Sequence, residues 1–406
     1  MWSKMNFRYI KKPSLINILA ALIILWLNAG MYSFVQRIIP GIFMYGIFMI
    51  WFICVIKNDM FITKFIKWTT TIIPSFILLF IMYIFHNSSL TKSYIMFFVY
   101  LVIISAISIY YQFDNDGRKI LYKVWLFDVF AVVFNTFLKI KSNPLVIRNM
   151  SANASVFESL FGGKLYGVAS FSNILCYIVI MLFLYSKIMN KRKNFNKGDL
   201  IGCIVLLLLI LKSQIAILIA FALIGLGLIT LVSFFKDIRK LLVFFFLITL
   251  LFVGIYKYIP GMLSYISTIE VLPELLRVKA LDVAWIISGS SNKLMDATIR
   301  MQQYENDIKC FIANPLLGTL GDSTNIGGHS TWIDLLGMYG ISSMIVMIWH
   351  FGIMKRIVKS VANEDKIMVT IIVIIFSIIG IIDPIFFQNV YMVFIFVIPY
   401  ISWQSK

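Results

Sequence analysis

The sequence is dominated by apolar runs that are long enough to cross a lipid bilayer. A transmembrane helix needs about 20 apolar residues, and such runs recur from residue 14 to residue 403. Hydrophobic residues make up 61% of the chain and charged residues only 13%, whereas soluble domains carry roughly 25% charged residues. A water-soluble fold of this size cannot bury so much apolar surface. The composition therefore excludes soluble enzymes and nucleic-acid-binding domains.

We predict an all-α polytopic integral membrane protein with about 12 transmembrane helices. The predicted spans are 14–35, 38–56, 69–85, 93–111, 122–140, 167–185, 200–211, 215–235, 241–259, 331–354, 367–382 and 385–403. The first nine helices, with a short external loop at 141–166, occupy 1–259. A large extracytoplasmic loop subdomain at 260–330 lies between the ninth and tenth helices, and the last helices occupy 331–406.

The basic residues predict how these helices are oriented. Placing both termini in the cytoplasm puts most of the 36 Lys and Arg residues in inner loops, including the clusters Lys191-Arg192-Lys193 and Lys355-Arg356. Short cytoplasmic loops are enriched in Lys and Arg. The net charge of +18 reflects these clusters, so we expect no nucleic-acid partner. We expect a plasma-membrane protein with 260–330 outside.

The long outer loop has the composition of an ordered subdomain. Connections longer than about 12–15 residues are usually functional or disordered, but this one contains Trp285, Tyr304 and Phe311. Its segment 293–312 is predicted to form an amphipathic helix that ends at Asn314-Pro315.

Basic side chains also occur in the predicted outer loops and at the outer helix ends. Arg and Lys can hold the diphosphate of a lipid-linked substrate, and the planar guanidinium of Arg matches two phosphate oxygens at once. For each residue taken singly, the alternative is a solvated loop charge. The candidate diphosphate-binding residues are Arg148, Lys164, Lys212, Arg277, Lys279 and Arg300.

His329 is the strongest candidate for a catalytic group. It lies where the long loop enters a predicted membrane helix, and a neutral imidazole there can take a proton from an incoming hydroxyl. Gly327 and Gly328 would let the backbone approach a bulky ligand. Asp334 follows within the next turns of helix and is a candidate to orient the ring. The alternative is a histidine that caps the helix at the membrane interface.

Three motifs follow one another in the C-terminal part of the chain. They run from Arg300-Met-Gln-Gln-Tyr to Asn314-Pro315-Leu316-Leu317-Gly318, through Gly328-His329-Ser330 with Asp334, to Tyr339-Gly340-Ile341. They resemble the C-terminal signature of bacterial O-antigen and capsular-polysaccharide polymerases (the Wzy family) and of the related O-antigen ligases. A weaker resemblance lies in Gly167-Val-Ala-Ser-Phe-Ser-Asn173. The resemblance implies that Arg300 holds undecaprenyl diphosphate and that His329 activates the acceptor hydroxyl.

One turn departs from the family pattern. Members often carry Ser-Arg between two helices, where this chain has Lys212-Ser213-Gln214. Gln214 supplies no charge, and Lys212 is the nearest substitute.

The resemblance implies a bacterial inner-membrane glycosyltransferase, an oligosaccharide repeat-unit polymerase. The growing glycan leaves undecaprenyl diphosphate for a hydroxyl of a new lipid-linked repeat unit on the outer leaflet. Because the diphosphate is a good leaving group, we expect neither a metal nor a cofactor. The implied partners are the undecaprenyl-diphosphate-linked oligosaccharide, the lipid bilayer, a chain-length regulator and a flippase protein.

Three other functions remain open at this point. An O-antigen ligase shares the chemistry but transfers the glycan to a lipopolysaccharide core. A lipid-linked oligosaccharide flippase or other transporter would need charges along a central cavity within the spans, whereas the candidate charged residues named above are predicted at one outer face. A structural membrane scaffold would not need the Arg300 and His329 pair.

Overall fold

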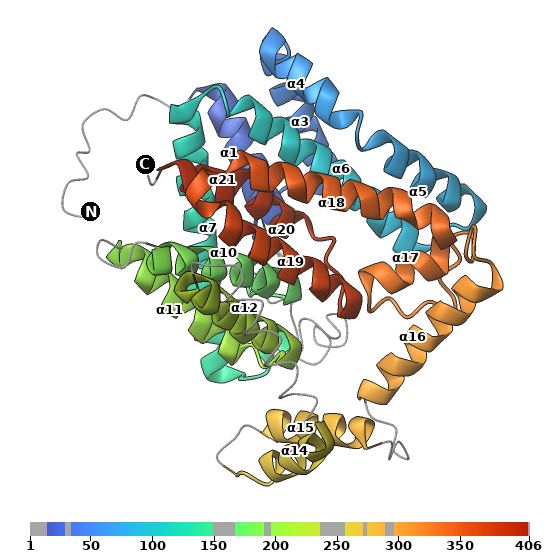
Figure 1. The fold of residues 1–406 in the computed structure, drawn as a ribbon. Helices are drawn as coiled ribbons and strands as arrows, with labels where there is room; N and C mark the ends of the chain where they lie inside the picture. Colours follow the sequence, from blue (N-terminus) through green and yellow to red (C-terminus); the bar gives the residue numbers. More distant parts are fainter. Residues whose placement is uncertain are drawn as a thin grey trace.

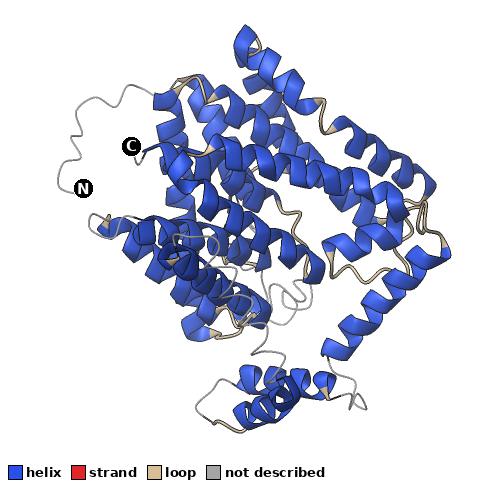
Figure 2. Ribbon diagram, in the orientation of Figure 1, coloured by secondary structure: helices blue, strands red, loops and turns tan. Residues whose placement is uncertain are grey.

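The computed structural model describes residues 14–28, 34–148, 167–190, 196–235, 256–270, 274–288 and 296–404. Helices account for 83% of these described residues, which contain no strand (Figure 2). The all-α prediction is therefore confirmed. The predicted cytoplasmic termini, most of the predicted loop 141–166 and most of the predicted span 241–259 lie outside the described residues.

The helices follow one another through short connections (Figure 1). The first are α1 (Leu15–Asn28), α2 (Phe34–Ile38), α3 (Gly41–Val55), α4 (Asp59–Thr69), α5 (Ile73–Phe85), α6 (Ser89–Tyr110) and α7 (Asn115–Ser142). The middle ones are α10 (Phe171–Asn190), α11 (Lys197–Lys212), α12 (Ala216–Phe234), η1 (Tyr256–Tyr258), α14 (Ile259–Ser267), α15 (Glu274–Ile287) and α16 (Asp296–Ala313). The last are α17 (Thr331–Tyr339), η2 (Gly340–Ser343), α18 (Met344–Ser360), η3 (Asn363–Asp365), α19 (Lys366–Ile382), α20 (Gln388–Met392), the π-helical η4 (Val393–Val397) and α21 (Ile398–Gln404).

Six of the described helical stretches are long and apolar enough to cross a membrane, or seven if the bent pair α4–α5 forms one span. They are Ser89–Tyr110, Asn115–Ser142, Phe171–Asn190, Ala216–Phe234, Thr331–Ser360 and Asn363–Ile382. α1 and α3 are apolar but shorter. Such helices satisfy their own backbone groups and form the architecture of a polytopic membrane protein. The full set of about 12 spans stays a prediction.

The predicted inner loop 57–68 is largely helical in the structure. α4 begins after Asn58, whose side chain accepts a hydrogen bond from the N–H of Phe61. The buried Phe61 ring then holds α4 against the bundle. α4 and α5 meet at 51°, because Pro74 in the first turn of α5 has no N–H to continue the helix.

The predicted span 331–354 lies in the long helical stretch Thr331–Ser360, which is divided into α17 and α18 by a bend at η2. In a straight helix Trp332 and His350 would lie about 27 Å apart, but their ring centroids are 4.9 Å apart. The chain turns back at Gly340, whose φ of +59° lies in the left-handed region that favours glycine. The Trp332 ring of α17 therefore lies against His350 and Phe351 of α18, and α18 is the longer of the two helices.

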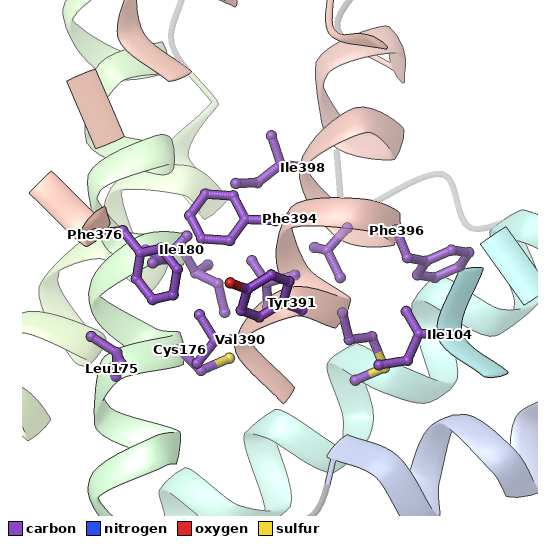
Figure 3. Packing of buried hydrophobic residues seen from close by; sticks show 14 of the residues in the cluster. Ile104, Leu175, Cys176, Ile180, Phe376, Val390, Tyr391, Phe394, Phe396 and Ile398 are labelled. Carbon is purple, nitrogen blue, oxygen red and sulfur yellow. The ribbon is translucent and has the colours of Figure 1, made fainter. Parts of the chain in front are cut away.

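α10 and the C-terminal helices form the centre of the bundle. Leu175, Cys176 and Ile180 of α10 face the C-terminal segment that contains Tyr391 and Phe394 (Figure 3). Apolar helices in lipid associate through close van der Waals packing, and these large buried side chains supply that contact.

A polar contact fixes the register of three of these helices. His350 of α18 hydrogen-bonds to the Tyr391 hydroxyl at 2.6 Å and to the Ser377 hydroxyl at 3.1 Å. No polar residue near His350 in the sequence predicts this pairing. Both ring nitrogens of His350 are satisfied, so its role in the structure is packing.

The described part of the predicted outer loop contains the helices α14, α15 and α16. α14 and α15 pack against each other, and Figure 1 shows this pair apart from the main bundle. α16 follows α15 in the chain and packs against α17 of the main bundle. The predicted helix at 293–312 is confirmed as α16, which ends directly before Asn314-Pro315.

Candidate functional site

One face of α16 carries polar side chains to the end of α19. Arg300, Tyr304 and Asp307 lie at positions i, i+4 and i+7, which share one face of a helix. The Tyr304 hydroxyl donates a hydrogen bond to the carbonyl oxygen of Ile382, at 2.8 Å. Arg300 Nη1 lies 3.4 Å from Asp383 Oδ1. These contacts attach the polar face of α16 to the last residue of α19 and the residue after it.

The Arg300–Asp383 pair is buried on one side only. The Asp383 side chain is 5% exposed, whereas that of Arg300 is 41% exposed. Burial raises the pKa of Asp383 to about 6, and the positive charge of Arg300 opposes this shift. Asp383 thus holds one edge of the guanidinium, and the rest of it can meet an anion. The sequence analysis did not identify Asp383 as a functional residue.

A pair of carboxyl groups lies where α16 meets α17. Asp307 and Asp334 are both fully buried, and each carboxyl group acts on the other. Two neighbouring buried carboxyl groups repel each other when both are ionised, which favours a single proton shared by the pair. Asp307 accepts the backbone N–H group of Gly327, at 3.0 Å, and Asp334 accepts that of Ser330, at 3.1 Å. Burial raises the pKa of Asp307, and the interactions with Asp334, the Gly327 N–H and His329 oppose this shift.

The predicted contact between Asp334 and the His329 ring does not occur among the described residues. Asp334 accepts a hydrogen bond from the backbone N–H of Ser330 instead, and it interacts with the carboxyl group of Asp307. Its place is at the first turn of α17, where it fixes the chain on the C-terminal side of His329. Asp307 is the carboxyl group whose charge acts on His329.

His329 precedes the cap of α17 and does not form it. The cap is Ser330, whose hydroxyl accepts a hydrogen bond from the N–H of Ile333 at 3.1 Å. This geometry contradicts the alternative of a helix-capping histidine. Burial and the charge of Arg300 lower the pKa of His329, and Asp307 opposes the shift. The imidazole is therefore neutral at pH 7, the form that can accept a proton.

The Asn-Pro-Leu-Leu-Gly motif has a structural role. The carbonyl of Pro315 accepts the N–H of Ile341 at 2.7 Å, and the N–H of Thr319 donates to the carbonyl of Gly337 at 3.0 Å. At Gly318 (φ +58°) an added Cβ would lie 2.4 Å from the Gly337 carbonyl oxygen. The motif therefore closes the loop over the end of α17 and positions His329 indirectly.

The two glycines before His329 differ in their surroundings. An added Cβ at Gly327 would lie 2.7 Å from the Cβ of Gln303, so this glycine permits close packing on α16. Gly328 has a φ of +68° and faces open space. Only Gly328 has room for the predicted approach of a ligand.

The weaker motif at the start of α10 forms a second polar group. Asn173 Oδ1 accepts hydrogen bonds from the N–H of Ser170, at 3.1 Å, and from its hydroxyl, at 3.0 Å. Asn389 Nδ2 lies 3.4 Å from the Ser172 hydroxyl. The segment from Asp383 to Asn389 therefore contacts both motif regions and places them at the same end of the bundle.

The other predicted diphosphate ligands that the structure describes lie on other elements than Arg300 and His329. Lys164 and the side chain of Lys279 lie outside the described residues. Lys212 is exposed at the end of α11, before Gln214 with its φ of +56°. Arg148 follows α7 and Arg277 lies on α15. In the described ranges, no hydrogen bond or ion pair joins Arg148, Lys212 or Arg277 to Arg300 or His329. Their role in binding diphosphate stays a prediction.

Sequence reasoning missed Asp307, Tyr304 and Asp383 as members of the site. A signal existed for the first two, because they share the helical spacing of Arg300 within the predicted helix 293–312. No local signal connects Asp383 to Arg300, because the two residues are 83 positions apart.

Neither a candidate metal site nor a similar known protein helps to identify what the site binds. The described ranges contain no group of three or more His, Cys, Asp or Glu residues able to hold a metal. The chain has one Asp-x-Asp triplet, at Asp114–Asp116, and there the Asp114 side chain caps α7 by accepting the N–H of Gly117 at 2.9 Å. No protein-family model matches the sequence, and no curated protein matches it.

Proposed function

We propose that this chain is a membrane glycosyltransferase that polymerises lipid-linked oligosaccharide repeat units. The growing glycan would leave undecaprenyl diphosphate for a hydroxyl of a new lipid-linked unit on the outer leaflet. The observation that carries this proposal is that the half-exposed Arg300 lies close enough to His329 for its charge to lower the pKa of the imidazole, at the end of the bundle where α16 contacts α17 and Asp383. A phosphate-binding cation and a proton acceptor are the two groups that this transfer requires.

The proposed step balances without a co-reactant. The acceptor oxygen attacks the anomeric carbon and gives its proton to His329. The bond between that carbon and the diphosphate oxygen breaks, and the diphosphate leaves with the electron pair. Arg300 stabilises the negative charge that develops on the leaving group. One glycosidic bond thus replaces one sugar–phosphate bond.

The surroundings of Arg300 support this role. Asp383 and the turn of α16 that carries Tyr304 hold the guanidinium before any substrate arrives. A preorganised donor stabilises a developing charge more effectively than one that must reorient during the reaction. The buried Asp307–Asp334 pair likewise fixes the backbone on both sides of His329.

The proposal is tested with purified protein in liposomes and lipid-linked repeat units extracted from the source cells. His329→Ala should slow polymer formation by about 10²–10⁴-fold, and His329→Asn should be equally slow because an amide cannot accept the proton. Wild-type activity should fall at acid pH only below the ordinary histidine pKa of about 6.5, because burial and Arg300 lower the pKa of His329. Product length on a gel is the readout.

The control for this experiment is His86→Asn. His86 Nδ1 lies 3.2 Å from the Leu320 carbonyl, and its replacement should leave polymer formation unchanged. Wild-type activity in His329→Asn would exclude the general base. Transfer to a lipopolysaccharide core instead of a second repeat unit would identify a ligase. Movement of the lipid-linked unit across the bilayer with no new bond would identify a transporter.

A further inference from the structure

An apolar groove lies between α5 and α18. Its volume is about 310 Å³. Its walls are formed by Pro74, Ser75, Ile348, Trp349, Gly352 and Ile353. Trp349 and Ile353 are buried along its floor, whereas Ile348 is 66% exposed at its rim. The groove therefore opens toward the surface of the bundle where lipid would lie.

One end of the groove is positively charged. Arg356 lies there, and its Nη1 is 3.3 Å from the Thr71 hydroxyl. Lys355 and Lys359 lie within one turn of Arg356 on α18. No acidic side chain forms an ion pair with Arg356 among the described residues. A guanidinium in this position can bind a phosphate.

The start of α5 adds to the attraction for an anion. α5 begins at the same end of the groove, and its N-cap, Ile72, provides no side-chain hydrogen bond to the first turn. The N-terminus of a helix carries a partial positive charge, which remains here although Pro74 supplies no N–H group to the first turn. Arg356 and the N-terminus of α5 therefore both favour a negatively charged ligand.

The groove has the length of one lipid leaflet. Ile345 and Arg356 line its two ends on α18 and are about 16 Å apart at 1.5 Å per residue. The hydrocarbon core of a bilayer is about 30 Å thick, so this length matches one acyl layer. A phosphate at Arg356 would place an acyl chain along Trp349 and Ile353.

The charged end of the groove is remote from the candidate functional site. α18 and α19 are joined by the short η3, so Arg356 lies near the beginning of α19 and Asp383 at its other end. The 17 residues of α19 separate these ends by about 25 Å. The basic cluster around Arg356 predicts that this end is cytoplasmic.

We propose that the groove binds one anionic glycerophospholipid of the cytoplasmic leaflet. Its phosphate lies on Arg356 and the first turn of α5, and one acyl chain lies between α5 and α18. Basic pockets between membrane helices on the cytoplasmic side are suited to anionic head groups. The proposal does not depend on the transferase activity, because no residue of the groove belongs to the candidate site.

Native mass spectrometry of the full-length protein tests the charge at this site. Phosphatidylglycerol is added to delipidated protein, with phosphatidylcholine as the neutral comparison. Arg356→Gln should weaken phosphatidylglycerol binding roughly tenfold, because a hydrogen bond to a charged group is lost. Lys355→Gln removes the same charge from the neighbouring residue, which does not line the groove, and should change binding less than about twofold.

A second variant tests the shape of the groove. A Cβ added at Gly352 meets no atom within 4 Å, so Gly352→Leu fills the groove without displacing protein atoms and should abolish the bound lipid. Gly227 of α12 is exposed and equally unobstructed, so Gly227→Leu is the matched control and should bind normally. Equal circular dichroism and elution volume would show that both variants are folded.

Three results would overturn the proposal. One is equal binding by Arg356→Gln and Lys355→Gln. Another is retention of phosphatidylglycerol by Gly352→Leu at the level of Gly227→Leu. The third is displacement of phosphatidylglycerol by equimolar undecaprenyl phosphate, which would assign the groove to a polyprenyl lipid.

Discussion

The two ends of the helical bundle use charge in different ways. At the end where α16 meets α19, Arg300 is paired with Asp383, and Asp307 is paired with Asp334. At the opposite end, Lys355, Arg356 and Lys359 follow one another on α18 with no acidic partner among the described residues. Clusters of cations at helix ends orient helices in a membrane. Buried and paired charges of both signs are typical of a site with chemistry.

The comparison shows why a count of basic residues does not locate the site. The richest cation clusters lie at the predicted inner side, where exposed charges cost little and interact weakly. Arg300 is a single cation, but a buried carboxylate fixes its position. Fixed position is what a cation needs to stabilise a developing charge.

The largest expected difference is in the labelling of the two ends of the bundle from outside the cell, because we predict that they lie on opposite sides of the membrane. Single cysteines are introduced at Asn325, in the loop before His329, and at Lys359, in a background without Cys54, Cys176, Cys203 and Cys310. A membrane-impermeant maleimide applied to intact cells should label Asn325→Cys and not Lys359→Cys. Labelling of both positions from the same side would contradict the assignment of opposite ends.

The next largest effect is expected from Arg300. Arg300→Ala should reduce polymer formation by about 10²–10³-fold, as the loss of one preorganised donor does. Arg300→Lys should recover little, because an ammonium group cannot form the two parallel hydrogen bonds of a guanidinium. Polymer length is measured on a gel at equal protein expression. Arg277→Ala on α15 is the comparison and should have a smaller effect; normal chains from Arg300→Ala would remove Arg300 from the mechanism.

A smaller effect is expected from Asp383. Asp383→Asn keeps the shape of the side chain but removes the charge that holds Arg300, so kcat should fall about tenfold with less change in KM. The matched control is Asp365→Asn at the other end of α19, where the carboxylate bonds to Ser402. If both variants have wild-type kcat, Asp383 serves only to end the helix.

The smallest effect is expected from Asp307, as a change in pH dependence. Burial raises its pKa, so the folded state holds the proton more tightly than the unfolded state. The resulting stability is complete below the ordinary aspartate pKa of about 3.9 and is lost as the pH rises through the raised value. Asp307→Asn cannot ionise, so its Tm should fall a few degrees less than that of the wild type as the pH rises above the ordinary aspartate pKa.

The control for this measurement is Asp322→Asn. Hydrogen bonds from Thr324 lower the pKa of Asp322, so its contribution is present above the ordinary aspartate pKa and is constant over this range. Identical pH profiles for Asp307→Asn and the wild type would show that the Asp307–Asp334 pair does not retain a proton.

Much of the fold could be predicted from local sequence. α6, α10 and α19 lie close to the predicted spans because long apolar runs have few alternatives to a membrane helix. α16 was predicted from its polar and apolar spacing and from Asn314-Pro315. The helix in the predicted inner loop was missed because α4 carries charges that resemble those of a loop. The turn at Gly340 was missed because an apolar run continues on both sides of it.

The sequence by itself determined that the chain is helical and apolar, and it identified Arg300 and His329 as candidates. These properties depend on residues close together in the chain, so the periodicity of apolar residues and the local composition are enough to predict them. The tertiary structure decided which charges are paired. Arg300 meets Asp383 across 83 positions, and Asp307 meets Asp334 because the loop at Asn314-Pro315 closes over α17. Burial makes these pairings decisive, since a charge removed from water needs a partner that only the packing of distant helices can supply.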